Sequence, residues 1–409
     1  MPKSRSARNP ARIRGQGVMA ILFWLAVLFV IYTYLGYPLL VFLLSRWKPA
    51  GAPQAGELPV VTLLIAAYNE EKVIAQKLDN SLDLDYPRER LQILVAADGS
   101  SDKTPDVVRQ YESQGVTLSY IPERNGKMAA ITRAMPLARG EIVVFSDANN
   151  MYDRQAIRAL VAPYADPKVG ATTGAKLIIE DSRPLSSAEG FYWKYESWIK
   201  KSETRLSTCT SAVGEMLSIR KELFMAPARN IVNDDRYMVF DLIRRGYRIY
   251  YTPQARSYET VSKSAGDEIV RRTRITVGAY QTMAMAARLL PFNRPLVLWQ
   301  VLSHKFFRAF VPFAMLLALL SNLALVLWPA QPGRYAFWAV ASPFNNIFLA
   351  LQGLFYAVAV LGNLFPSRGK LGKILYIPTF LLNSNLAALL GLYSFLTNKK
   401  PHLWKRVNR

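Results

Sequence analysis

Residues 141–149 read EIVVFSDAN, and this stretch decides the fold predicted for the chain. Its apolar run is typical of a buried strand, and the run stops at Asp147, with Asn149 two positions later. In open α/β sheets, ligands bind at the carboxyl ends of the strands. Hard cations such as Mg²⁺ or Mn²⁺ take oxygen ligands and often share them with phosphates. The stretch therefore predicts a strand that presents two oxygen-bearing side chains to a cation, although Asp and Asn are also ordinary turn formers.

Strands and helices alternate on the N-terminal side of this stretch. Earlier buried strands are predicted at residues 60–66, 91–97 and 116–121. Each is followed by a helix pattern, and Thr104 with Pro105 looks like the start of one helix. Four strands alternating with helices predict the α/β class, with a mostly parallel, doubly wound sheet. Residues 166–287 continue as a mixed α+β segment with an aromatic helix candidate at 188–199.

Polar, turn-forming residues follow all four predicted strands. They are Tyr68-Asn69-Glu70-Glu71, Asp98-Gly99-Ser100, Asn125-Gly126-Lys127 and Asp147-Ala148-Asn149. A nucleotide needs such an edge, with acceptors for its base, a lysine and backbone N–H groups for its phosphates, and oxygens for a cation. Each motif alone is weak, because Asn, Asp and Gly occur in most loops. Their order and spacing together predict a nucleotide site.

The composition limits the chemistry and the partners. The chain has 409 residues, a net charge of +22 and a hydrophobic fraction of 51%. The charge suits nucleic acid, anionic lipid or a phosphate-rich substrate, but no nucleic-acid-binding module is recognisable. The single cysteine, Cys209, excludes an intrachain disulfide. The two histidines, His304 and His402, lie in or beyond the C-terminal apolar region, so proton transfer in the middle of the chain must use Asp, Glu, Lys or Tyr.

Long apolar runs near both ends predict a membrane protein. The predicted segments are a basic tail at 1–17, a transmembrane helix at 18–45, a large α/β domain at 58–287, an amphipathic interfacial helix at 290–308, two to three transmembrane helices within 309–396 and a basic tail at 397–409. The positive-inside rule favours cytoplasmic tails. One N-terminal span, however, puts the N-terminal tail and the large domain on opposite sides, so the charge pattern leaves the topology open.

The order of the strand-end motifs resembles the inverting family 2 glycosyltransferases, which have the nucleotide-sugar-binding GT-A fold. The likeness is closest to membrane members similar to hyaluronan, chitin, cellulose and poly-N-acetylglucosamine synthases, and it covers about residues 58–282. The resemblance implies that Tyr68, Glu70 and Asp98 face the base and ribose, and that Lys127 lies near the nucleotide. It also matches Asp147 and Asn149 to the D-x-D-type site for Mg²⁺ or Mn²⁺, with an amide in place of the second carboxylate.

A later block resembles the part of the family's sequence that carries the general base. Residues 233–235 read NDD and residues 242–248 read LIRRGYR, which resembles the family's T-E-D block and its R-x-G-Y-R segment. The likeness makes Asp235 the counterpart of the general base. The chemistry needs one, because an acceptor hydroxyl must lose its proton as it attacks the anomeric carbon. The alternative is that Asp234 and Asp235 simply cap a helix.

The last motif is Arg271-Arg272-Thr273-Arg274-Ile275. It falls where processive members carry Q-x-x-R-W, so Arg274 matches the arginine while Arg271 and Ile275 replace the glutamine and the tryptophan. Guanidinium groups suit a departing diphosphate. The alternative is a basic helix beside anionic headgroups. The aromatic helix at 188–199 either lines an acceptor path or packs at the membrane interface.

The sequence and the resemblance together predict a membrane-bound, metal-dependent inverting hexosyltransferase. It would move a hexose or N-acetylhexosamine from a UDP-sugar to a growing polysaccharide or glycan, in the cell (inner) membrane with the catalytic domain cytoplasmic. A single-transfer enzyme with a lipid acceptor is the nearest alternative, and a nucleotide-binding membrane regulator without activity is the alternative from another class. The implied partners are the donor, the acceptor, membrane lipids, and accessory export or regulatory subunits.

Overall fold

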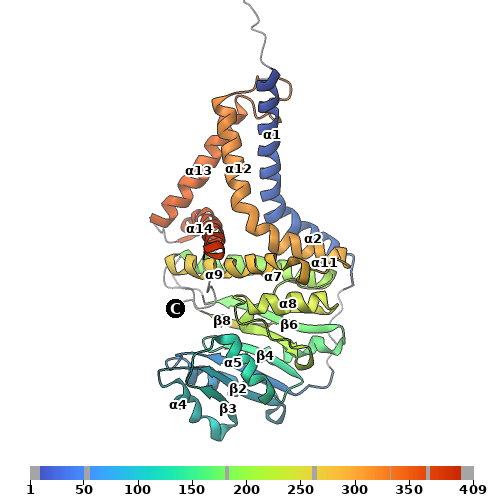
Figure 1. The fold of residues 1–409 in the computed structure, drawn as a ribbon, viewed down its shortest axis with the longest axis vertical. Helices are drawn as coiled ribbons and strands as arrows, with labels where there is room; N and C mark the ends of the chain where they lie inside the picture. The colour runs from blue at the N-terminus through green and yellow to red at the C-terminus, as the bar shows by residue number, and fades with distance from the viewer. Residues whose placement is uncertain are drawn as a thin grey trace, which may run out of the picture.

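The computed structural model describes residues 10–49, 56–179, 184–259, 265–331, 333–364 and 369–397. The outer parts of both predicted basic tails, residues 1–9 and 398–409, lie outside these ranges. The described chain forms three tiers (Figure 1): a sheet with its covering helices, a layer of helices lying across it, and long helices that point away from it.

An eight-stranded mixed sheet forms the first tier, in the order β3-β2-β1-β4-β7-β6-β8-β5. The strands are β1 Val61–Ala67, β2 Leu91–Asp98, β3 Val116–Ile121, β4 Ile142–Asp147, β5 Met151–Tyr152, β6 Val169–Ile178, β7 Leu217–Arg220 and β8 Arg248–Glu259. Strands β1 to β4 are parallel to one another, whereas β7 runs antiparallel to both β4 and β6. The predicted α/β class with a doubly wound sheet is therefore confirmed, and the mixed half begins at β7.

Helices cover both faces of the sheet because its central strands are apolar on both sides. The helices are α3 Ile74–Leu82, α4 Thr104–Arg109, α5 Lys127–Ala134, α6 Ala156–Val161 and α8 Asp234–Arg244. In β1, Leu64 joins the core that contains Ile131 of α5, whereas Leu63 and Ile65 join the opposite core with Ile74 of α3. Successive residues of a strand point to opposite faces, which explains the unbroken apolar run.

The second tier consists of helices that lie between the sheet and the membrane part (Figure 1). They are α7 Pro184–Leu206, α9 Ala265–Ala284, α10 Ala286–Leu289 and α11 Pro295–Val301, with α2 Tyr37–Ser45 beside α7. Two π-helical turns meet here, η1 Tyr32–Gly36 and η8 Leu302–Phe306. Tyr32 bridges them, because its hydroxyl lies 2.8 Å from Ser303 Oγ and accepts a hydrogen bond from Trp299 Nε1 at 2.9 Å.

Within the part of the chain that the structure describes, four helices are long and apolar enough to cross a membrane, at Arg14–Ser45, Pro295–Leu327, Phe344–Leu364 and Tyr376–Thr397. They include most of α1 Pro10–Ile31 and of α14 Gly369–Thr397, and all of α12 Phe307–Leu327 and α13 Phe344–Leu364. Helices α1 and α12 lie side by side, and Phe23 of α1 packs in the same core as Ala318 and Leu325 of α12. Their outward side chains are largely exposed apolar residues, as a lipid-facing surface requires. The chain is a membrane protein.

Candidate active site

The loop after β2 holds the loop after β3 through Asp98. This carboxylate is 4% exposed, and its two oxygens accept hydrogen bonds from the backbone N–H groups of Asn125 (2.9 Å) and Gly126 (2.7 Å). Gly126 has a φ of +91°, a conformation that favours glycine. Asp98 therefore fixes the turn that starts α5 and aims Lys127. Its part in binding a nucleoside remains a prediction from the resemblance.

The loop after β1 carries Tyr68 and Glu70 and is tied to the same edge. The guanidinium carbon of Arg124, which follows β3, lies 4.1 Å from the centre of the Tyr68 ring. The backbone N–H of Glu70 donates to Thr104 Oγ1 at 2.8 Å, at the start of α4. Asn69 between them has a φ of +53°. The structure thus brings the first three strand-end loops together, as the order of motifs predicts.

Lys127 pairs with the end of β4 and lies within electrostatic reach of the start of α8. Its Nζ lies 2.7 Å from Asp147 Oδ1. Loss of hydration would lower the pKa of Lys127, but the negative charges of Asp147, Asp234 and Asp235 outweigh it and raise that pKa above its usual value. One ammonium group therefore lies within electrostatic reach of carboxylates that are almost ninety residues apart in the chain.

Asp235 lies in the first turn of α8. Its Oδ1 accepts the backbone N–H of Arg236 at 2.7 Å, so it does satisfy one amide of the helix start. Gly214 packs against it so closely that an added Cβ would lie 3.3 Å from Oδ2. Burial, and then the charge of Asp234, raise the pKa of Asp235 to about 6. A carboxylate with this pKa is ionised at neutral pH yet basic enough to accept a proton.

The predicted metal ligands supply oxygen donors only. Asp147 ends β4 and Asn149 follows in the turn before β5, and both are partly exposed. Among the described residues, no group of three or more Asp, Glu, His or Cys side chains could hold a metal ion. Two oxygen-bearing side chains fit a hard cation that takes its remaining ligands from a diphosphate and water. They do not make a closed metal site on their own.

The arginines of α9 have different surroundings. Arg271 pairs with Glu189 of α7 at 2.9 Å and with Glu268 at 2.7 Å, and its side chain is 12% exposed. Arg274 is exposed and makes no ion pair with another described residue. The contacts of the described chain therefore do not join either arginine to Asp147, and their role in holding a diphosphate remains a prediction.

Sequence reasoning missed Lys77. This lysine is fully buried, its Nζ donates to the backbone oxygen of Asn150 at 2.6 Å, and it lies 3.9 Å from the centre of the Tyr152 ring. Burial lowers the pKa of Lys77 to about 7, although the charge of Asp147 acts in the opposite direction. The sequence did contain a sign that Lys77 is buried, because this lysine lies between Ile74 and Leu78 on the apolar face of α3. Lys77 supports the turn that carries Asn149.

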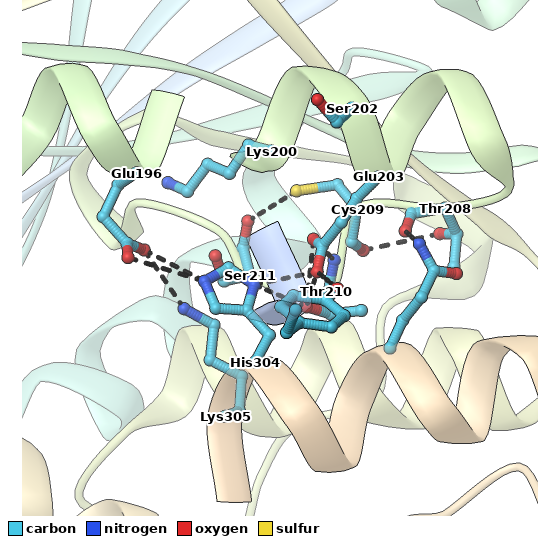
Figure 2. A network of polar contacts seen from close by, with 12 residues as sticks. Glu196, Lys200, Ser202, Glu203, Thr208, Cys209, Thr210, Ser211, His304 and Lys305 are labelled. Atoms are coloured by element: carbon cyan, nitrogen blue, oxygen red, sulfur yellow. Dashed lines mark hydrogen bonds and ion pairs between the residues drawn. The ribbon is translucent and has the colours of Figure 1, made fainter. Parts of the chain in front are cut away.

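The aromatic helix predicted at 188–199 is part of α7, and it packs on the membrane part. Tyr192 contacts Phe380 of α14, and Trp198 contacts Phe42 of α2. The buried face of α7 also carries Glu196 and Glu203. Figure 2 shows these two carboxylates facing His304, which lies 2.8 Å from Glu203 Oε1 and 3.3 Å from Glu196 Oε2. The sequence left two interpretations of this aromatic helix, and the structure shows the packing against the membrane part that one of them predicts.

Comparison with known proteins agrees with this architecture. Residues 62–226 match the family model of glycosyl transferase family 2. The chain is 28% identical over 233 residues to a poly-beta-1,6-N-acetyl-D-glucosamine synthase of Staphylococcus aureus (strain COL), an alignment that covers 56% of each protein. It is 26% identical over 280 residues to the probable glycosyltransferase YdaM of Bacillus subtilis (strain 168), covering 63% of this chain and 64% of that protein. The chain thus aligns with little more than half the length of these relatives.

A solved structure matches over most of the chain. It is the mannosyltransferase PcManGT from Pyrobaculum calidifontis, in complex with GDP-Man and Mn²⁺, with a TM-score of 0.68 and 24% identity. The match covers 92% of this chain and 99% of that one, and it shows a shared fold. The fold and site thus define a GT-A-like domain attached to membrane helices. More particularly, residues 62–226 of this domain are similar to glycosyl transferase family 2.

Proposed function

We propose that this protein is a membrane-bound inverting glycosyltransferase that moves a hexose or N-acetylhexosamine from a UDP-sugar to a glycan acceptor. The observation that carries the proposal is the convergence of Asp147, Lys127 and Asp235 at one edge of the sheet. The poly-N-acetylglucosamine synthase and the mannosyltransferase among the similar proteins support the reaction class. Experiment has to identify the sugar and the nucleotide of the donor that this chain uses.

Each residue has a defined task in this proposal. Asp235 accepts the proton of the acceptor hydroxyl as that oxygen attacks the anomeric carbon, and its pKa of about 6 suits this step. Lys127 offsets the negative charge of the donor's phosphates. Asp147 and Asn149 would hold Mg²⁺ or Mn²⁺, which would neutralise charge on the departing diphosphate.

The remaining predicted residues bind the rest of the donor. Tyr68, Glu70 and Asp98 surround the position proposed for the nucleoside. Arg271 and Arg274 are proposed to meet the departing diphosphate, and for Arg271 this requires it to leave the carboxylates of Glu189 and Glu268.

The test uses purified membranes incubated with labelled UDP-sugars and with labelled GDP-mannose, each with and without Mn²⁺. We expect transfer from one donor, dependent on the cation and lost in Asp235→Asn. Gel filtration of the labelled product separates a polymer from a single transfer to a lipid. A preparation that binds nucleotide but never hydrolyses or transfers from any donor would establish the non-enzymatic regulator instead.

The proposed location is the cell (inner) membrane, with the sheet on the cytoplasmic side. Helix α1 begins at the end of the membrane part that is farthest from the sheet (Figure 1). The start of α1 and the sheet would therefore lie on opposite sides of the bilayer. Accessory export or regulatory subunits remain proposed partners.

A further inference from the structure

Helix α3 carries two polar side chains that hold the chain just after Asn149. Lys77 and Asn80 are three residues apart, so they lie on the same side of this helix. The ammonium of Lys77 donates to the backbone oxygen of Asn150 at 2.6 Å. Asn80 makes two hydrogen bonds to the backbone of Tyr152, because its Nδ2 donates to the carbonyl oxygen at 2.9 Å and its Oδ1 accepts the N–H at 2.8 Å. One side of α3 therefore fixes three backbone groups that follow Asn149.

The turn that these contacts hold carries both oxygen ligands proposed for the cation. Asp147 ends β4, where it pairs with Ala66 of β1. The backbone N–H of Asn150 donates back to the backbone oxygen of Asp147 at 3.5 Å. Asn149 is thus placed between a residue held by the sheet and a residue held by α3. Because a cation needs its ligands at set distances, the backbone on either side of Asn149 decides how well the two side chains can bind it.

Lys77 is an unexpected residue for the position that it occupies. It is fully buried beside Ile74 and Leu78, and no ion pair joins it to a carboxylate of the described residues. A buried charge without an ion pair is costly, so an apolar side chain would suit this core better. The ring of Tyr152, whose centre lies 3.9 Å from the ammonium, offsets part of that cost. A lysine at this point of the core indicates a role beyond packing.

Asn150 shows a similar cost on the other side of the contact. Its side chain is fully buried, and neither Oδ1 nor Nδ2 has a hydrogen-bond partner among the described residues. Native proteins rarely leave buried polar groups unsatisfied, and the exceptions call for a functional explanation. The turn after β4 therefore keeps polar groups inside the core, and Lys77 of α3 satisfies the backbone oxygen of this residue.

The contacts of α3 also reach the segment that packs on the proposed base. Tyr152, whose backbone is held by Asn80, donates its hydroxyl to the backbone oxygen of Glu215 at 2.5 Å. Glu215 follows Gly214, where an added Cβ would lie 3.3 Å from Asp235 Oδ2. A continuous series of contacts thus joins α3, the chain after Asn149 and the segment beside the base.

We propose that Lys77 and Asn80 are positioning residues that hold Asp147 and Asn149 in the arrangement that binds Mg²⁺ or Mn²⁺ together with the donor diphosphate. The inference rests on the proposed function and adds to it two residues from outside the strand-end loops. Both act through the backbone that follows Asn149. Their loss therefore lowers the affinity for the cation and leaves the residues proposed for the nucleoside in place.

The test measures Mn²⁺ binding to the full-length protein in phosphatidylcholine nanodiscs by calorimetry, with saturating UDP in one series and saturating GDP in another. We expect Lys77→Met to weaken Mn²⁺ binding about ten- to a hundredfold, as the loss of a residue that orients a metal ligand commonly does. Asn80→Ala should weaken it in the same direction, and it decides the question if Lys77→Met does not fold. Binding of UDP in the presence of a chelator should match that of the wild type.

Lys221→Met is the matched control, because it removes the same kind of contact from the other end of β4. Lys221 Nζ donates to the backbone oxygen of Ala138, which precedes that strand. This variant should therefore bind Mn²⁺ like the wild type. Thermal unfolding shows that each variant is folded before its affinities are compared.

Three results would overturn the inference. Folded Lys77→Met and Asn80→Ala could bind Mn²⁺ as the wild type does. Lys221→Met could weaken Mn²⁺ binding as strongly, in which case any loss of contacts around β4 suffices. The α3 variants could weaken UDP equally in the chelator, in which case they disturb the whole edge of the sheet.

A separate variant distinguishes failure of the inference from failure of the proposed function. Asp147→Asn removes a proposed ligand and should abolish Mn²⁺ binding. If it binds Mn²⁺ normally, or if the wild type binds none with either nucleotide, the proposed cation site itself is wrong. If only Asp147→Asn loses Mn²⁺, the cation site stands and its support by α3 is wrong.

Discussion

Replacing Asp235 by asparagine should abolish transfer and, at the same time, stabilise the folded protein. The pKa of this carboxyl rises from an ordinary 3.8 to about 6 in the fold. Each pKa unit corresponds to 1.36 kcal/mol, so ionised Asp235 destabilises the fold by about 3 kcal/mol at pH 8. This free-energy cost already includes the attraction of the Asp235 carboxylate to Lys127 and Arg236, because both charges lower the pKa of Asp235. Asparagine carries no charge, so this cost disappears while its oxygen can still accept the N–H of Arg236.

The sign of the pH dependence follows from linkage. The folded protein holds the Asp235 proton more tightly than the unfolded chain does, so wild-type stability falls as pH rises from about 4 through about 6. The advantage of Asp235→Asn should therefore be fully present at pH 8 and roughly halved at pH 5. At pH 8 the transfer rate should be lower by about 100-fold or more, because the general base is missing, and at pH 5 the difference should be about tenfold smaller, because most wild-type Asp235 is then protonated.

Thermal unfolding of the purified protein in nanodiscs, at pH 5 and pH 8, tests this prediction alongside a transfer assay. Asp241→Asn is the matched control on the same helix, since Asp241 pairs with Arg244 and Arg245 at 3.5 and 3.3 Å. It should lower the Tm, because Asp241 is 8% exposed and its charge pairs with both arginines, whereas Asp235→Asn should raise it. A lower Tm for Asp235→Asn than for the wild type at pH 8 would refute the reasoning about its burial. Retained transfer would refute its role as the base.

Other perturbations test the surroundings of the base. Asp234→Asn removes the like charge beside Asp235, so the acidic limb of the pH–rate profile should move to lower pH, and an unmoved limb would contradict the coupling. Asp98→Ala leaves the N–H groups of Asn125 and Gly126 without acceptors, which should cost about 2–3 kcal/mol and lower the Tm measurably. Chelation of divalent cations should abolish transfer, and added Mn²⁺ or Mg²⁺ should restore it, whereas full activity in the chelator would exclude the cation.

The sequence by itself determined the elements and their class. The strands β1 to β4 and the helices between them follow from apolar runs broken by Asn, Asp and Gly, which act over a few residues at a time. The membrane helices follow from length and apolarity alone. Helix α14 is continuous, although the polar residues Asn383 and Asn385 lie within its apolar run. A helix satisfies its own backbone hydrogen bonds, and the Asn383 side chain donates to Asn363 of α13 at 2.9 Å.

Only the tertiary structure decided what the site residues touch. The strand-end motifs predicted a shared edge, because parallel strands end on one side. They did not show that Asp98 binds the backbone of the next loop, or that Lys127 pairs with Asp147 within electrostatic reach of Asp235. Nor could any local pattern place Arg271 against Glu189. These contacts join residues far apart in the chain, and their charges and pKa values depend on burial and neighbours, which exist only after the sheet and its helices have packed.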